Sequence, residues 1–154
     1  MGYLMGFVLF VFGVPAIMWL FSASFAFSVK RTAVFVAMAV IGLGLSVWSI
    51  VHMRNVGKGN PMDAFNHEVA PRTSELMADG PYAICRNPML LGILMYYLGV
   101  VVLLWSVGSA LAFAAYALIM SVQVSFEEKR LEKDFGEAYV RYRGKTRRLV
   151  PFVW

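Results

Sequence analysis

The chain has 154 residues, enough for one domain, and 60% of them are hydrophobic. A soluble domain is about 45–50% apolar, so this composition excludes an ordinary soluble fold and indicates a protein that uses lipid as its solvent. The net charge of +5 does not indicate a nucleic-acid partner, because the basic residues flank apolar segments or alternate with acids.

Four apolar segments are long enough, or nearly so, to cross the hydrocarbon core of a membrane, which takes about 20 helical residues. We expect the first at residues 4–29, ended by Lys30 and Arg31, and the second at residues 32–53. The third and fourth lie within residues 89–126, which carry no charge and are too long for one span. Residues 105–109 form the natural turn, which leaves a short third span of about 17 residues.

Nearly all charged residues lie in two segments. Residues 54–86 and 127–148 hold twelve of the 14 Lys and Arg and all nine Asp and Glu. A helical hairpin between these segments places both on one side of the membrane, and the positive-inside rule makes that side the cytoplasm. We therefore predict one all-α, multi-pass domain of about four transmembrane helices over residues 1–154, in a bacterial inner membrane.

The two halves of this domain differ in character. Residues 1–53 hold two spans, whereas residues 54–154 combine a loop, the hairpin and a tail into the functional core. Prolines and glycines prevent the loop from forming one long helix. In the tail, four apolar side chains share one helical face, which predicts an amphipathic helix lying on the bilayer or over the loop. They are Leu131, Phe135, Tyr139 and Tyr142.

Arg86, Asn87 and Pro88 stand where the loop enters the third span. Pro88 suits the first helical position because its missing N–H would be unpaired there, and Asn87 suits the N-cap. One interpretation is therefore a capped helix with an arginine that extends to the membrane surface. The other is a functional site, since a helix N-terminus offers N–H groups and partial positive charge to an anion.

Glu127 and Glu128 lie where the fourth span leaves the membrane. Neighbouring residues on a helix point about 100° apart, so at most one of these carboxylates faces an inner site. An ordinary charged helix end is the simpler interpretation. Acids are unusual at the cytoplasmic end of a span, however, and this favours a functional role.

Four motifs occur in a fixed order along residues 57–151. They are Gly57-Lys58-Gly59-Asn60-Pro61; Gly80-Pro81-Tyr82 with Arg86-Asn87-Pro88-Met89-Leu90-Leu91-Gly92; Glu127-Glu128 before Leu131; and Phe135-Gly136-Glu137-Ala138-Tyr139-Val140-Arg141-Tyr142 ending at Pro151. Each motif is weak alone, but the ordered set resembles the isoprenylcysteine carboxyl methyltransferase and phospholipid methyltransferase superfamily, in a bacterial-type form.

The resemblance implies an integral membrane enzyme that uses S-adenosylmethionine to methylate a lipidic or small apolar acceptor. It makes Arg86 and Glu127 the candidate catalytic residues, with Glu127 preferred over Glu128, and Gln123 the candidate substrate contact. The implied cofactor-binding residues are Ser74, Glu75, Leu76, Met77, Tyr82, Asn87, Pro88, Met89, Leu90 and Glu127.

Three positions depart from the family pattern. Gln123 stands where the isoprenylcysteine enzymes have a substrate-contacting arginine, which argues against a carboxylate acceptor. Asn87 replaces the usual histidine, as in bacterial-type members, and Leu90 replaces a tyrosine. The acceptor group therefore stays open between a prenylcysteine-like carboxylate, a phospholipid amine and a thiol.

Methyl transfer requires few catalytic groups from the protein. A methyl group on a sulfonium is already activated, so transfer needs mainly alignment and exclusion of water. A carboxylate such as Glu127 or Glu128 would stabilise the sulfonium charge or accept a proton from an amine or thiol. No metal is required, and the single Cys85 and the isolated His52 and His67 predict no metal site.

Two other function classes remain open. A membrane reductase of the sterol-reductase type, using NADPH, has a similar Arg-His-Pro signature. The missing histidine and tyrosine and the short chain disfavour it. A non-catalytic membrane module that kept the fold would bind neither nucleotide, and the sequence makes no prediction of oligomeric state.

Overall fold

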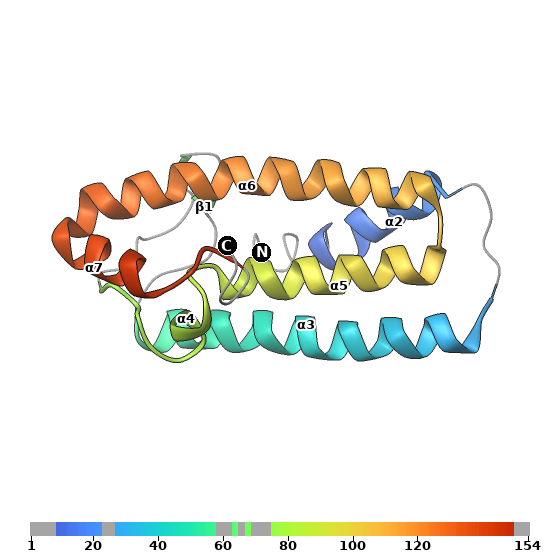
Figure 1. Ribbon diagram of the computed structural model, residues 1–154, viewed down its shortest axis with the longest axis horizontal. Helices are drawn as coiled ribbons and strands as arrows, with labels where there is room; N and C mark the ends of the chain where they lie inside the picture. Colours follow the sequence, from blue (N-terminus) through green and yellow to red (C-terminus); the bar gives the residue numbers. More distant parts are fainter. Residues whose placement is uncertain (1–8, 23–26, 58–62, 65–66, 69–74, 150–154) are drawn as a thin grey trace.

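The computed structural model describes residues 9–22, 27–57, 63–64, 67–68 and 75–149. Within them the protein is almost entirely helical, which confirms the all-α prediction, and three long helices lie side by side (Figure 1). The long helices are α3 (Val29–Asn55), α5 (Pro88–Leu104) and α6 (Val107–Phe135). The shorter elements are the π-helix η1 (Leu9–Gly13), α2 (Val14–Leu20), α4 (Pro81–Ile84), α7 (Glu137–Lys145) and the antiparallel strands β1 (Asp63–Ala64) and β2 (His67–Glu68).

Helices α3 and α5 approach each other closely at a pair of glycines. A Cβ added to Gly42 would lie 2.4 Å from the carbonyl oxygen of Gly92, and one added to Gly92 would lie 2.2 Å from that of Gly42. Ser46 completes the contact, because its Oγ lies 3.0 Å from the carbonyl oxygen of Met89 on α5. Small residues thus allow the two backbones to meet. Gly44, in contrast, faces open space.

Helices α5 and α6 form the predicted hairpin with a tight turn. Trp105 adopts a left-handed conformation with φ 47°, and α6 begins at Val107. Ser106 caps α6, since its Oγ accepts a hydrogen bond of 3.1 Å from the backbone N–H of Ser109. The prediction of a turn within residues 105–109 is confirmed, and α5 has the expected short length of 17 residues.

The first apolar segment forms a shorter helix than predicted. Within the described residues it is helical over Leu9–Leu20, whereas we expected a span over residues 4–29; residues 1–8 and 23–26 lie outside the described residues. Its end docks on the start of α6, where a Cβ added to Gly108 would lie 1.9 Å from the carbonyl oxygen of Phe21. A glycine at position 108 thus allows the end of α2 to approach the backbone of α6 closely.

The beginning of the same segment is held by two tyrosines of α5. The hydroxyl of Tyr96 donates to the carbonyl oxygen of Val11 (2.8 Å), and that of Tyr97 donates to Phe10 (2.6 Å). These bonds satisfy buried hydroxyls and take up carbonyls of the irregular π-helical turn. Tyr97 and Met18 of α2 belong to one buried cluster, so the short helix is packed against α5.

Two helices among the described residues are long and apolar enough to cross a membrane by length and composition. They are α3 and α6, whose outward-facing apolar side chains are consistent with a lipid environment. Lys30 and Arg31, which we expected to end the first span, lie instead in the first turn of α3. The helix that contains the predicted second span, residues 32–53, therefore begins slightly earlier, at Val29.

The loop and the tail meet at one end of the bundle, where Figure 1 shows α4 and α7 together. The hydroxyl of Tyr142 on α7 donates to the carbonyl oxygen of Tyr82 on α4 at 2.7 Å. All four residues of the predicted apolar face, including Leu131 and Phe135, pack in one cluster with Met77 and Tyr82. The tail thus covers the loop, as one of the two alternatives predicted.

The tail is not one continuous helix, however. Gly136 adopts φ +53°, a conformation that side chains other than glycine rarely adopt, and it separates α6 from α7. The predicted helical face is therefore divided between the last turns of α6 and the whole of α7. The break turns α7 back toward α4.

Candidate functional site

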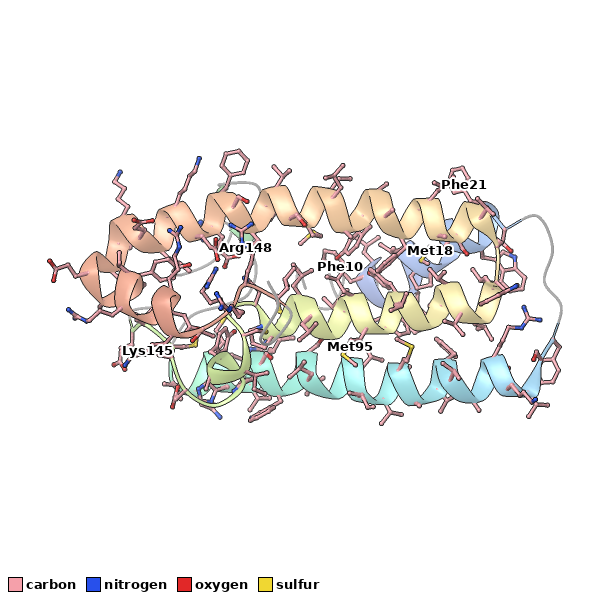
Figure 2. All side chains as sticks on the ribbon, in the orientation of Figure 1. Phe10, Met18, Phe21, Met95, Lys145 and Arg148 are labelled. Atoms are coloured by element: carbon pink, nitrogen blue, oxygen red, sulfur yellow. The ribbon has the colours of Figure 1, made fainter. Side chains whose placement is uncertain are left out.

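The predicted site residues that the structure describes lie at the polar end of the bundle. Figure 2 shows nitrogen and oxygen atoms gathered there, around α7 and the labelled Lys145 and Arg148. Four elements meet at this end: α4, the start of α5, the C-terminal half of α6, and α7 with the chain that follows it. The site is therefore assembled from segments far apart in the sequence.

A buried carboxylate at this end binds two arginines. The Oε1 of Glu128 lies 2.7 Å from the Nε of Arg86, and its Oε2 accepts from the Nε of Arg148 at 3.0 Å and from the Nη2 of the same residue. The side chains of Arg86 and Glu128 are 11% and 8% exposed. A buried ion pair is costly unless its polar atoms are satisfied, and here both carboxylate oxygens are.

Arg86 also binds the C-terminal end of α7. Its Nη1 donates to the carbonyl oxygen of Arg143 at 3.2 Å and to that of Thr146. The last carbonyls of a helix have no partner within the helix, so a guanidinium is well suited to satisfy them. Arg86, predicted as a catalytic candidate or a surface-seeking side chain, thus lies at the centre of a network that joins α6 and α7.

Residues 146–149, which we name the strap, run across the start of α5. The backbone N–H of Arg86 donates to the carbonyl oxygen of Arg147 (2.8 Å), and that of Asn87 donates to Arg148 (3.2 Å). Leu149 at the end of the strap is buried against Leu90 of α5 and against Val124 of α6. The strap is therefore fixed by main-chain bonds, by an apolar contact and by the Glu128 ion pairs.

The start of α5 has the predicted form with one difference. Asn87 occupies the N-cap and Pro88 the first turn, but the amide Nδ2 of Asn87 donates to the carbonyl oxygen of Arg148 at 3.2 Å instead of capping the helix. The Asn87 side chain thus binds a carbonyl oxygen of the strap and leaves the first N–H groups of α5 without a side-chain cap. The N–H groups of Met89 and Leu90, in the first turn, have no acceptor within the helix.

Two buried tyrosines lie in the cluster that α4 and α7 form at the polar end. Tyr82 and Tyr139 are 6% and 1% exposed, and within the described residues neither hydroxyl has a hydrogen-bond partner. Burial, followed by the negative charge of Glu127, raises the pKa of Tyr82 above its usual value. Burial raises the pKa of Tyr139 to about 12. Both hydroxyls therefore stay protonated at neutral pH and can donate to a ligand.

Glu127 and Glu128 have different surroundings. Glu128 is buried with its two arginines, whereas Glu127 is half-buried and close enough to Tyr82 for its charge to affect that hydroxyl. The expectation that at most one carboxylate faces an inner site agrees with this difference. Besides burial, the charge of Glu127, the preferred candidate, raises the pKa of Tyr82, whereas the charges of both carboxylates raise the pKa of Tyr139.

The loop candidates are distributed unevenly. Met77 is buried, Leu76 is half-buried, and both pack in the cluster of Tyr82, Tyr139 and Tyr142, whereas Glu75 is exposed. Gln123 is buried on α6. Ser74 lies outside the described residues, as do residues 58–61 of the first motif and Pro151 of the last. No group of three or more His, Cys, Asp or Glu in the described part of the chain could hold a metal.

Several residues that complete this arrangement were not predicted from the sequence. Arg148, Thr146 and Leu149 come from a basic stretch that resembles any charged tail, so no local signal marked them. Gly80 belongs to one of the motifs, and the structure shows why this position needs a glycine. It has φ +54°, and an added Cβ would lie 2.8 Å from the ring of His52, whose Nε2 is 2.9 Å from Asp79.

Comparison with known proteins identifies the family. Residues 30–138, more than half of the chain, match the phospholipid methyltransferase family. The chain belongs to this family. The match runs from the first turn of α3 into α7, so it includes α4, the start of α5 and Glu127 and Glu128.

Two curated relatives are similar to this member of the phospholipid methyltransferase family. Protein-S-isoprenylcysteine O-methyltransferase B of Arabidopsis thaliana is 34% identical over 94 residues, which cover 58% of this chain and 48% of the relative. Protein-S-isoprenylcysteine O-methyltransferase of Schizosaccharomyces pombe is 29% identical over 137 residues, covering 86% of this chain and 54% of the relative. The chain thus spans about half the length of these relatives. No solved structure matches it.

Proposed function

We propose that the protein is an integral membrane methyltransferase that uses S-adenosylmethionine as methyl donor and acts on a lipidic acceptor. The observation that carries this proposal is the family match over residues 30–138, which includes α4, the start of α5, Glu127 and Glu128. The two relatives are named for methylation of isoprenylcysteine, a lipid-modified amino acid, and this supports a lipidic acceptor.

The residues at the polar end fit a methyl donor of this kind. The ligand carries an aromatic base, an ammonium, a carboxylate and a positively charged sulfur. The hydroxyls of Tyr82 and Tyr139 have no partner in the described part of the chain and would bind its polar groups, since an unpaired buried hydroxyl costs about 1–3 kcal/mol. The N–H groups of Met89 and Leu90 would bind its carboxylate, since a helix N-terminus favours an anion.

When bound, S-adenosylmethionine supplies an activated methyl group on a sulfonium. Glu127 would lower the energy of the positive charge beside it and accept a proton from an amine or thiol acceptor. Met77, Tyr82 and Leu90, which are buried, would exclude water and align the two reactants. We propose the contacts from Ser74, Glu75, Leu76, Asn87 and Pro88 on the family resemblance alone.

Gln123 is proposed to contact the acceptor. It is buried on α6, about one helical turn before Glu127, so both side chains belong to the same stretch of the helix. A neutral amide can donate to a carboxylate or accept from an amine. The acceptor class is therefore lipidic, with its reactive group to be decided by assay.

We also propose four membrane crossings with the polar end in the cytoplasm. Residues 1–53 would supply two crossings, and residues 54–154 would form the methyltransferase core of the same domain. The 17 residues of α5 span about 25 Å, which is slightly less than the hydrocarbon core of about 30 Å and suits a thin or locally thinned bilayer. A bacterial inner membrane agrees with the bacterial-type motif.

Calorimetric titration of the detergent-purified protein with S-adenosylhomocysteine, with NADPH in parallel, tests this function. We expect saturable binding of S-adenosylhomocysteine and none of NADPH. Transfer of a radiolabelled methyl group to a prenylcysteine, a phospholipid amine or a thiol then identifies the acceptor. Binding of NADPH instead would favour a reductase, and binding of neither would favour a non-catalytic module.

A further inference from the structure

Glu128 connects three segments that would otherwise be separate at the polar end. It lies on α6, it binds Arg86 from the segment between α4 and α5, and it binds Arg148 from the strap. Arg148 is also bonded to α6 a second time, because its Nη1 lies 3.2 Å from the Oγ of Ser125. The two carboxylate oxygens of Glu128 are thus already occupied by arginines.

A carboxylate occupied in this way is poorly placed to bind the methyl donor directly. Its side chain is 8% exposed, and each of its oxygens accepts from a charged group. Charge-assisted hydrogen bonds are stronger than neutral ones, so a ligand would have to displace a guanidinium to reach it. Direct binding of the methyl donor is therefore proposed for Glu127 and not for Glu128.

The strap that Glu128 holds lies against the proposed ligand-binding residues. The carbonyl oxygen of Arg148 accepts from both the backbone N–H and the Nδ2 of Asn87, the N-cap of α5. One residue earlier, the carbonyl oxygen of Arg147 accepts from the N–H of Arg86. The position of the first turn of α5 thus depends on the strap, and the strap depends on the arginine that Glu128 binds.

We infer that Glu128 is a positioning residue that acts on the methyl-donor site through Arg86 and Arg148. It pins the strap across the start of α5 and so holds Asn87, Met89 and Leu90 where they bind the donor. This inference rests on the proposed function for the role of the first turn of α5. The pinning itself follows from the bonds described above.

The test measures hydrogen exchange at the backbone amides of Arg86 and Asn87, which donate to the strap, in the full-length protein. In Glu128→Gln we expect these amides to exchange about tenfold faster or more, since a charged acceptor is lost. The matched control is Glu132→Gln, one helical turn along α6, where an exposed carboxylate pairs with Arg143 at the surface. We expect wild-type exchange in that control.

Ligand binding adds a readout that a purely structural role would not change. Affinity for S-adenosylhomocysteine should fall in Glu128→Gln, and saturating S-adenosylhomocysteine should slow the exchange of both amides again, because binding favours the ordered strap. In Glu127→Gln, affinity for S-adenosylhomocysteine should fall, while the amides of Arg86 and Asn87 should exchange at the wild-type rate. This opposite pattern separates the positioning carboxylate from the binding one.

Variants of Arg148 test the same contact from its other side, so the inference can be tested even if Glu128→Gln does not fold. Arg148→Lys keeps the positive charge but loses the two-nitrogen contact of the guanidinium with Glu128. The exchange rate of the amides of Arg86 and Asn87 should therefore lie between the rates in the wild type and in Arg148→Gln. Arg141→Gln, at an exposed pair on α7, is the control for the loss of an arginine.

Wild-type exchange in both Glu128→Gln and Arg148→Gln would overturn the inference, and so would lost affinity with unchanged exchange. If the wild type does not bind S-adenosylhomocysteine while exchange still rises in Glu128→Gln, the proposed function fails and the pinning remains.

Discussion

At the scale of single residues, two neighbouring carboxylates have different surroundings. Glu128 is enclosed by Arg86 and Arg148, and Glu127 lies half-buried near Tyr82. Their side chains point about 100° apart because they are consecutive on one helix. The buried ion pairs of Glu128 join α6 to Arg86 and to the strap, and binding of the methyl donor is the role proposed for Glu127.

The first prediction follows from this difference. Glu127→Gln should weaken S-adenosylhomocysteine binding by about 1.5–3 kcal/mol, since a hydrogen bond to a charged group is lost. The melting temperature without ligand should fall less than in Glu128→Gln, which loses a buried carboxylate bound to two arginines. Calorimetric titration and a melting curve of the same preparation measure both. Unchanged affinity would remove Glu127 from the site.

A second prediction concerns the unpaired hydroxyl of Tyr82. Tyr82→Phe removes a buried hydroxyl that has no hydrogen-bond partner among the described residues, so the ligand-free protein should be as stable as the wild type or slightly more stable. Affinity for S-adenosylhomocysteine should fall by about 0.5–1.5 kcal/mol if the hydroxyl binds the ligand. Melting curves with and without ligand separate these effects. Tyr142→Phe is the contrasting control, because its hydroxyl bonds Tyr82 within the protein and its loss should destabilise both forms.

At the scale of helices, patterns local in sequence were predictive. The absence of charge over residues 89–126 predicted the α5–α6 hairpin, and the Trp105 turn falls within the predicted residues. The apolar face of the tail predicted which side chains pack over the loop. These features depend on period and composition, which a sequence carries directly.

Features that depend on distant partners were not predictable in this way. The sequence motif favoured a capping role for Asn87, but the strap, 61 residues away, takes its side chain. The break at Gly136 serves the turn of α7 toward α4, and the first helix ends where Phe21 meets Gly108. Arg148 is marked by no motif because its partner Glu128 is brought near only by folding.

The third prediction belongs to the α3–α5 crossing. Gly92→Ala would place a Cβ 2.2 Å from the carbonyl oxygen of Gly42 and 2.4 Å from the Oγ of Ser46, so the helices must separate. We expect a loss of about 1–3 kcal/mol, as for other overpacked sites. Gly44→Ala, on the same α3 but in open space, should be neutral or slightly stabilising. Unfolding of both variants in detergent measures the difference, and equal stability would contradict the close crossing.

At the scale of the whole molecule, the bundle has an apolar body and a polar end, and α6 is long enough to extend through both. Helix α6 has 29 residues and is about 44 Å long, whereas a hydrocarbon core is about 30 Å thick. In the proposed membrane crossing, its last turns, which carry Glu127 and Glu128, would project beyond the core. The site would lie at the membrane surface, where a water-soluble methyl donor and a lipidic acceptor can both reach it.

The last prediction tests this orientation. Lys30, in the first turn of α3, and Lys145, at the end of α7, are both exposed, and helix α3 carries the chain from one end of the bundle to the other. Lys30→Cys and Lys145→Cys should react with a membrane-impermeant maleimide from opposite sides, because the basic loop and tail favour the cytoplasm. The native Cys85 is fully buried and should contribute little background. In intact cells we expect labelling at position 30 alone, with position 145 labelled only after permeabilisation. Labelling of both from the same side would mean that the polar end does not lie across the membrane from the start of α3, and the proposed cytoplasmic site would have to be abandoned.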